Sequence, residues 1–358
     1  MRLLICTQAV DTEDPILGFF HRWVEEFAKH SERVHVICLK EGAHHLPPNV
    51  SVHSLGKEGK TANSEQRTAN RISYVIRFYF LIWKYRNEYD TVFVHMNPEY
   101  VLLGGLLWRL WRKRIVLWYV HRQSTFALRL AASLVQKIAT SAKGSIGLRS
   151  PKIAVVGHGI DTDAFSGPVR PLDKSAPKIV TVGRISPIKS LHTIVEAVGS
   201  LREHGIDASL DIIGPTIYEG DLRYKTRIED LIRERNLADR VRILPAVPNS
   251  RMPELYSSYD IAVNACPAGG IDKAVLEAMA AGEPVFVANE SFREYLGNHA
   301  RALIFRFEDH ADLAQKIRTL LSRNDIPSLQ NALRVLVRER ADVGRCISAI
   351  MQLYARHT

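Results

Sequence analysis

The chain has 358 residues, of which 46% are hydrophobic and 24% charged, the composition of an ordinary globular protein. This length exceeds what one hydrophobic core usually supports and therefore predicts two domains. The cysteines lie far apart, which excludes a disulfide framework and a zinc ribbon. No apolar run is long enough for a membrane span or a signal peptide, so we expect a cytoplasmic protein, soluble or peripheral. The four cysteines are Cys6, Cys38, Cys266 and Cys346.

Short apolar runs alternate with longer amphipathic segments along the chain. Several runs are continuously apolar, which is typical of parallel strands that are covered on both faces. The order of strands and helices predicts an α/β fold with two doubly wound, Rossmann-like domains. The strands that we expect are 2–8, 33–39, 91–95, 114–120, 152–157, 178–183, 209–214, 240–245, 260–265, 283–288 and 301–305.

A linker rich in proline and charge interrupts this rhythm at residues 166–177. It predicts a first domain at 1–165 and a second at 178–339, facing each other across a cleft that would hold a ligand.

The region between residues 67 and 152 carries fifteen lysines and arginines but three acids, while the whole chain has a net charge of +10. Within it, segments 71–86 and 106–114 interleave arginines with aromatic residues and leucines. Such segments can lie on an anionic membrane, and they can equally be two helices with apolar faces in a core. A nucleic acid would also suit the charge, but no recognition motif supports one.

The segment 178–198 combines a strand with two cations. The strand ends at Gly183, Arg184 and Lys189 follow in the loop, and a helix begins near Ser190. Because helix N-termini attract anions, the two cations could hold a diphosphate there. They could equally be solvated charges on a surface loop.

The segment 260–284 places two glycines in front of a helix. The turn runs from Cys266 to Gly270, and the helix is expected from about Asp272 to Ala281. Glu277 lies inside this helix among apolar neighbours, and a buried acid needs a partner. This favours a carboxylate that binds two neighbouring hydroxyls of a ligand over one on a solvated helix face.

Five segments together resemble the retaining glycosyltransferases of family 4, which have the GT-B fold. They are GRISPIK, LDIIG, DIAVNA, VLEAMAAGEPV and, in the first half, IAVVGHGIDTDAF. The resemblance implies transfer of a sugar from a UDP- or GDP-sugar to an acceptor hydroxyl of a lipid-linked or cell-surface glycan precursor. It implies no metal or other cofactor, and a C-terminal helix at about 340–358 that joins the first domain. A membrane acceptor would place the protein on the inner face of the cell membrane.

The resemblance also assigns roles to individual residues. Arg184 and Lys189 match the pair that binds the donor diphosphate, and Glu277 matches the acid that holds the ribose. Gly214 matches a glycine lining the nucleotide site. His121 matches a histidine that contacts the transferred sugar, although by itself it could be a strand-end histidine without a ligand.

The chain departs from the family pattern in the glycine turn. The family usually has an acid eight residues before the ribose-binding glutamate, and this position is Gly269. Asp272 could replace that acid as a catalytic residue, or it could only cap the helix. We expect the amides of Gly269, Gly270 and Ile271 to bind the leaving diphosphate. The missing acid leaves open a non-catalytic subunit that binds a nucleotide sugar or glycan. For an epimerase of the same fold we find no cluster of catalytic acids.

The family often has a second Gly-Gly turn after its first strand. This chain has one glycine there, Gly18, at the start of the first expected helix. We predict that Gly18 brings the amides of its loop to the donor phosphate.

Overall fold

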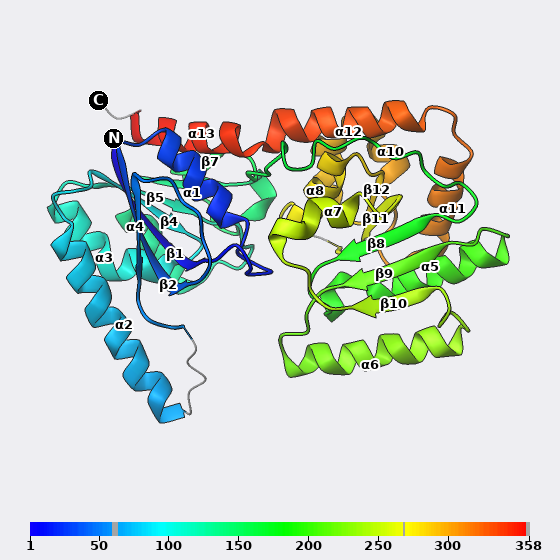
Figure 1. Ribbon diagram of the computed structural model, residues 1–358, viewed down its shortest axis with the longest axis horizontal. Coiled ribbons are helices and arrows are strands. Elements are labelled where there is room, and N and C mark those ends of the chain that lie inside the picture. The colour runs from blue at the N-terminus through cyan, green and yellow to red at the C-terminus, as the bar shows by residue number, and fades with distance from the viewer. Residues whose placement is uncertain (59–63, 268, 356–358) are drawn as a thin grey trace. The chain divides into compact units, whose positions relative to one another are not determined.

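The computed structural model describes residues 1–58, 64–267 and 269–355 and divides into two compact units (Figure 1). The first unit comprises Met1–Gly159, Pro248–Ser250 and Val343–Thr358, and the second comprises Ile160–Val247 and Arg251–Asp342. The predicted division lay at residue 165. In the structure, residues 160–165 belong to the second unit, in which Ile160 pairs in a parallel bridge with Asp342.

The first unit is built on a parallel sheet with the strand order β3-β2-β1-β4-β5-β6-β7. Strands β3 and β6 were not among the strands predicted from the sequence. The sequence of β3, VSVHS, is only partly buried at the sheet edge, and the sequence of β6, KIAT, is too short to show a period. The strands are β1 Arg2–Val10, β2 Arg33–Glu41, β3 Val50–Ser54, β4 Thr91–His95, β5 Arg114–Trp118, β6 Lys137–Thr140 and β7 Ile153–Val155.

Helices cover both faces of this sheet (Figure 1). One core layer joins α1 and α13 to alternate residues such as Leu3 and Ile5 of β1, and the other joins α2, α3 and α4 to Leu4 and Cys6. Because successive strand residues enter opposite core layers, the strands are continuous apolar runs in the sequence. The helices are α1 Phe20–Lys29, α2 Ser64–Lys84, α3 Pro98–Leu110, α4 Phe126–Leu134 and α13 Val343–Ala355.

The end of the chain is an integral part of the first unit. The Tyr354 hydroxyl of α13 donates a hydrogen bond to the carbonyl oxygen of Val92, 2.8 Å away, and Arg114 donates to the carbonyl oxygen of Tyr354. Cys346 and Ile347 are fully buried in the core layer that α13 shares with α1.

The second unit is built on a parallel sheet with the order β10-β9-β8-β11-β12. The predicted α/β class with two parallel-sheet domains is thus confirmed. The predicted strand at 301–305 is wrong: Ala300–Leu303 form helix α10, and only Ile304 makes a bridge, to Val287. An apolar run this short cannot be told from a buried helical turn. The strands are β8 Lys178–Val182, β9 Ser209–Ile213, β10 Val241–Leu244, β11 Ile261–Asn264 and β12 Val285–Val287.

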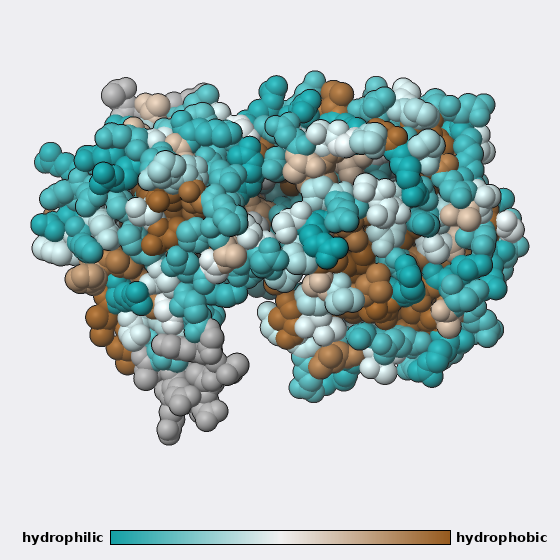
Figure 2. Space-filling view, viewed as in Figure 1, coloured by the Kyte–Doolittle hydropathy of each residue, from teal (hydrophilic) through white to brown (hydrophobic). Residues whose placement is uncertain are grey.

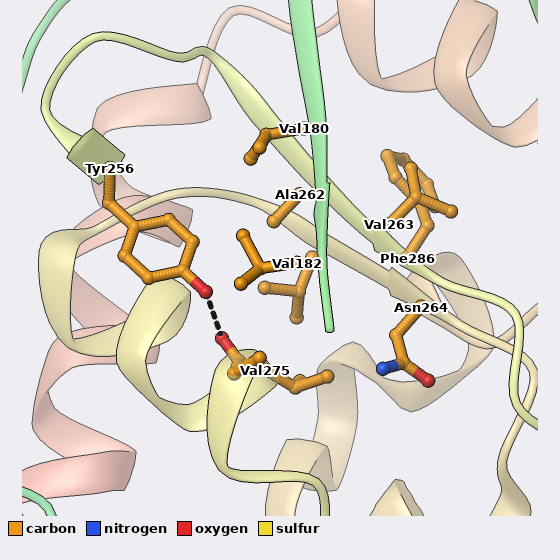
Figure 3. Close-up of a pocket in the computed structure, with 10 residues that line it drawn as sticks. Val180, Val182, Tyr256, Ala262, Val263, Asn264, Val275 and Phe286 are labelled. Carbon is orange, nitrogen blue, oxygen red and sulfur yellow. Dashed lines mark hydrogen bonds between the residues drawn. The ribbon is translucent and has the colours of Figure 1, made fainter. Parts of the chain in front are cut away.

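Helix α8 packs closely on this sheet. Between them lies a cavity of about 10 Å³, roughly the space that one water molecule needs. Val275 of α8 lines it, and the Tyr256 hydroxyl donates to the carbonyl oxygen of Ala274 in the first turn of α8, at 2.9 Å (Figure 3). The helices are α5 Leu191–Glu203, α6 Glu219–Glu234, α7 Met252–Tyr256, α8 Lys273–Ala281, α9 Arg293–Leu296, α10 Ala300–Leu303, α11 His310–Leu321 and α12 Ile326–Ala341. Across the described parts of both units, no helix has the length and apolar character to cross a membrane.

Candidate functional site

The candidate site lies where β8 and β11 end, next to each other in the second sheet. From β8 the chain continues to β9 on one side, while β11 and β12 lie on the other. The direction of winding therefore changes between β8 and β11, and doubly wound sheets bind ligands at the carboxyl end of such a switch point. The loop 183–190 and residues 265–267 and 269–272 flank it.

Lys189 and Asp272 join these two loops. The Lys189 ammonium lies 2.5 Å from one carboxylate oxygen of Asp272, and the Asn264 side-chain amide donates to the same oxygen at 2.8 Å. The other carboxylate oxygen accepts the Ala274 backbone N–H at 3.2 Å. Asp272 is therefore the N-cap of α8, as one of the two interpretations expected, and also the counter-ion of Lys189.

The pairing stabilises the charged forms of both groups. Burial alone would lower the pKa of Lys189, but the charge and hydrogen bond of Asp272 outweigh it and raise that pKa. Burial alone would raise the pKa of Asp272, but Lys189, Asn264 and the cap hydrogen bond lower it. Both groups are therefore ionised at neutral pH. The Lys189 ammonium carries three N–H donors, so a phosphate that binds it would share it with Asp272 or displace this carboxylate.

Asn264 and Cys266 are site residues that the sequence analysis missed. Asn264 is the last residue of β11, and its side-chain oxygen accepts the Cys266 backbone N–H at 3.2 Å. The Cys266 thiol lies beside Lys189: burial raises the pKa of this thiol, and the Lys189 charge opposes the increase. The polar asparagine at the end of an apolar strand was the signal that could have identified this position.

Arg184 contacts the start of a different helix. Its guanidinium lies over the ring of Tyr218, 5.3 Å from the centroid, and its Nε is 3.8 Å from a carboxylate oxygen of Asp221. Asp221 is buried and accepts the backbone N–H groups of Ile217 and Tyr218 at 3.0 and 3.1 Å. The two predicted diphosphate-binding cations thus lie in one loop and pair with different acids.

Glu277 is buried, as its apolar neighbours predicted. It forms an ion pair with Lys273, one turn earlier in α8, a partner that was not predicted from the sequence. The spacing of four residues places both side chains on the same side of the helix. The role of Glu277 in binding a ribose stays a prediction.

Gly214 has a steric reason to be glycine. Its φ is +157°, and a Cβ at this position would lie 1.9 Å from the carbonyl oxygen of Gly183. The loops after β8 and β9 approach closely here, and the Ile185 N–H donates to the carbonyl oxygen of Pro215 at 2.9 Å. Gly214 therefore fixes the loop that carries Arg184, whether or not it also lines a nucleotide.

The glycine turn before α8 is held through its carbonyl groups. The Gly269 carbonyl accepts the Ser291 hydroxyl at 3.3 Å, and the Gly270 carbonyl accepts the Asn289 side-chain amide at 3.2 Å. A Cβ on Gly269 would meet no atom within 4 Å, so this residue borders open space. Its φ of +148° is rare for residues with a side chain, so an acid at this position would be strained in the present backbone. The side chain of Ile271 is buried.

His121 and Gly18 belong to the first unit. His121 is exposed beyond the end of β5, and its Nδ1 accepts the Gln123 backbone N–H at 3.2 Å. Its contact with a sugar stays a prediction.

The prediction for the Gly18 loop needs correction, because its amides already have partners. The Gly18 N–H donates to the Asp14 carbonyl oxygen at 2.9 Å, and the N–H groups of Ile16 and Leu17 donate to the Asp14 carboxylate at 2.9 Å. The loop therefore does not offer these amides to a phosphate.

Two family models match the chain. One, described as glycosyl transferases group 1, matches residues 166–335, and another, described as glycosyl transferase 4-like, matches residues 16–121. The first model covers the candidate site in the second unit.

Curated relatives match part of the chain. The D-inositol 3-phosphate glycosyltransferase of Nocardia farcinica is 28% identical over 193 residues, which is 50% of this chain and 42% of that protein. The putative colanic acid biosynthesis glycosyltransferase WcaL of Escherichia coli K12 is 30% identical over 151 residues, 39% of this chain and 34% of WcaL. The chain thus spans about two fifths, or less, of the length of these relatives.

Solved structures match over the whole chain. Anabaena HepE, in complex with UDP and glucose, has a TM-score of 0.75 at 17% identity and is covered completely, as is this chain. Sucrose-phosphate synthase of Thermosynechococcus elongatus has a TM-score of 0.78 at 16% identity, with 99% of both chains covered. These likenesses show the GT-B fold. The two family models, which together match most of the chain, place it among the GT4-type glycosyltransferases.

Proposed function

We propose that the chain is a retaining glycosyltransferase that moves a sugar from a UDP- or GDP-sugar to an acceptor hydroxyl. The observation that carries this proposal is the charged network of Lys189, Asp272 and Asn264 at the switch point of the second sheet. A nucleotide diphosphate would bring two negative phosphates to a cation and a helix start of the kind that binds anions. UDP has further support, because HepE structures of the same fold contain UDP or UDP-glucose.

In the proposed reaction, Arg184 and Lys189 neutralise the diphosphate as it leaves. Hydrogen bonds to charged groups contribute roughly 1.5–3 kcal/mol each, which makes these cations the main source of leaving-group stabilisation. We propose that they do this without a metal ion or other cofactor. The amides of the Gly269–Ile271 turn would assist, and His121 would contact the transferred sugar.

Asp272 has a dual role in this proposal. In the free protein it holds Lys189, and when a diphosphate takes Lys189 the carboxylate becomes available to a hydroxyl of the donor sugar. Asp272 would thus supply the acid that the family has at the position of Gly269. Glu277 would accept hydrogen bonds from the two ribose hydroxyls.

The acceptor that we propose is a lipid-linked or cell-surface glycan precursor. The chain would then act from the cytoplasm, at the inner face of the cell membrane. The support is the excess of lysine and arginine between residues 67 and 152, which favours contact with anionic lipid.

A second candidate is a subunit that binds a nucleotide sugar without transferring it. Two observations favour it: Gly269 stands where the family has an acid, and the nearest acid, Asp272, is engaged by Lys189 and the helix cap. This candidate predicts binding of a nucleotide without release of its sugar.

A thermal-shift screen tests the proposal. The chain is heated with UDP, GDP and ADP and with their sugar conjugates, and we expect one nucleotide to raise Tm. At a hundredfold excess over Kd, this nucleotide would add about 2.7 kcal/mol to the free energy of unfolding. Glu277→Ala and the milder Glu277→Gln should lose this increase. Glu254→Ala, at an exposed position of α7, should keep it. No shift with any nucleotide would overturn the proposal.

A transfer assay then separates the two candidates. The stabilising nucleotide sugar is incubated with the protein, and the nucleotide released is measured with and without acceptor extract. Release together with a product whose anomeric proton shows the donor configuration supports the retaining transferase. A Tm shift without release supports the binding subunit.

A further inference from the structure

Helix α2 has apolar residues on two opposite faces. Its inner face carries Phe78 and Ile82, which are buried in the first unit. Its outer face carries four large apolar side chains at intervals of four, four and three residues, which form one stripe along the helix. These are Ile72, Ile76, Phe80 and Trp83, with exposed fractions of 58%, 65%, 60% and 56%. A helix apolar on both sides needs a partner for its outer side.

Helix α3 extends this stripe. Trp83 contacts Trp111, at the end of α3, edge-on with ring centroids 5.8 Å apart, and the Tyr79 hydroxyl donates to the Leu103 carbonyl oxygen at 3.0 Å. Leu106 and Leu110 of α3 are 70% and 76% exposed. Figure 2 shows apolar side chains along the outer edge of α2, at the lower left. We call Ile72, Ile76, Phe80, Trp83, Leu106 and Leu110 the α2–α3 face.

Cations lie beside the aromatic residues of the α2–α3 face. The Arg86 guanidinium lies over the Trp83 ring, 4.4 Å from its centroid, and the Lys84 ammonium is 6.0 Å from that of Phe80. Arg77 and Arg109 are also exposed on α2 and α3, but the Arg77 guanidinium lies close to Gly56 and Arg109 donates to the Ser133 carbonyl oxygen at 3.1 Å. Between residues 70 and 84 the helix contains no acidic residue. Aromatic rings beside cations with long apolar stems are characteristic of a membrane interface, where rings enter the headgroup region and cations meet phosphates.

We propose that the α2–α3 face binds the surface of an anionic lipid bilayer. The apolar stripe supplies buried area, and the cations at its border supply attraction to negative headgroups. The charge disfavours a second copy of this chain as the occupant. A two-fold interface would place each cationic border against its own copy, so that like charges face each other.

The purpose of this lipid contact rests on the proposed function: the α2–α3 face would bring the transferase close to a lipid-linked acceptor. The contact itself is argued from exposure and charge alone. A lipid-binding measurement therefore tests the face without any transfer, and its failure would leave the proposed transfer reaction standing.

The experiment is co-sedimentation of the whole chain with vesicles. One set contains phosphatidylcholine alone and the other phosphatidylcholine with phosphatidylglycerol. We expect binding to the second set, weakened by salt, and little to the first. Ile76→Ser with Phe80→Ser should weaken it about tenfold or more, because two exposed apolar side chains are lost from the contact. Lys84→Gln with Arg86→Gln should weaken it about twenty-fivefold at low salt, at about fivefold per cation.

Matched controls come from the second unit. Leu222→Ser with Phe307→Ser removes two side chains that are 55% and 42% exposed, and Lys225→Gln with Arg233→Gln removes two cations of α6. Both controls should bind vesicles like the wild type, and the Tm of each variant shows that it is folded.

Three outcomes would overturn the proposal. The first is wild-type chain that does not sediment with the anionic vesicles. The second is equal loss of binding in the variants of the face and in the controls, which would indicate attraction by net charge alone. The third is light scattering that shows a dimer which Ile76→Ser with Phe80→Ser converts to a monomer, since the face would then be an interface between copies.

Discussion

Lys189 and Asp272 are 83 residues apart in the sequence, yet their side chains form an ion pair of 2.5 Å. The pair joins the loop after β8 to the residue that caps α8, and Asn264 at the end of β11 binds the same carboxylate. A donor diphosphate would compete with Asp272 for the ammonium. In the proposed reaction, the strength of this pair would therefore contribute to the cost of donor binding.

Asp272→Asn should separate binding from turnover. Asparagine also caps helices well, so the start of α8 is preserved, while Lys189 loses its counter-ion. We expect UDP to bind about fivefold more tightly in calorimetry, equivalent to about 1 kcal/mol for a partly exposed pair. We expect the transfer rate to fall at least tenfold, since a carboxamide is a poorer acceptor of sugar hydroxyls. Unchanged UDP affinity would show that the pair does not compete with the diphosphate.

Removal of either cation should reduce transfer more than stability. For Arg184→Ala and Lys189→Ala we expect kcat/KM to fall roughly tenfold to a hundredfold, the effect of one lost charged hydrogen bond in the transition state. Arg202→Ala is the control, because its exposed ion pair with Asp239 lies away from the switch point. Steady-state kinetics measure the change, and a loss as large in the control would refute a specific role.

Gly214→Ala should disrupt the loop that carries Arg184. Its Cβ would lie 1.9 Å from the Gly183 carbonyl oxygen, so the backbone must move. We expect a loss of about 3 kcal/mol or more in the free energy of unfolding, measured with urea, and loss of UDP binding. Gly220→Ala is the matched control, since Gly220 lies in α6 with open space around it. This change should stabilise the protein by about 0.5–1 kcal/mol, and equal effects at both positions would contradict the steric argument.

His53 should make the first unit sensitive to acid. Its Nε2 is 3.1 Å from Nδ1 of His35, and both rings stack on Tyr85. Burial, followed by the charges of His35 and Lys84, lowers the pKa of His53 to about 4, below its value of about 6.5 in the unfolded chain. Between these values the unfolded state binds more protons, so stability falls as pH falls through this window.

The measurement is Tm against pH for the wild type and His53→Gln. We expect the variant to lose part of the slope between about pH 6.5 and 4, worth about 1–2 kcal/mol after allowance for solvent screening. His204→Gln, at an exposed position, should keep the wild-type slope. If the profiles of wild type and His53→Gln have the same slope, His53 does not cause the effect.

Sequence patterns predicted the fold better than the contacts of the site. Continuous apolar runs identified the buried strands, but β3 was missed because it lies half-exposed at a sheet edge. The burial of Glu277 followed from its apolar neighbours. Its pairing with Lys273 could also have been predicted, because the two residues are four positions apart in one helix. The pairing of Lys189 with Asp272 could not be predicted, because it depends on β8 and β11 being neighbours in the sheet.

The place of α13 has a consequence for how the protein is synthesised. The second unit is complete once Asp342 has left the ribosome, but the core of the first unit still lacks Cys346, Ile347 and Tyr354. Although β1 emerges first, the core of the first unit stays incomplete until α13 has emerged as well. A fragment that stops at Gly159 would expose the sheet surface that α13 covers.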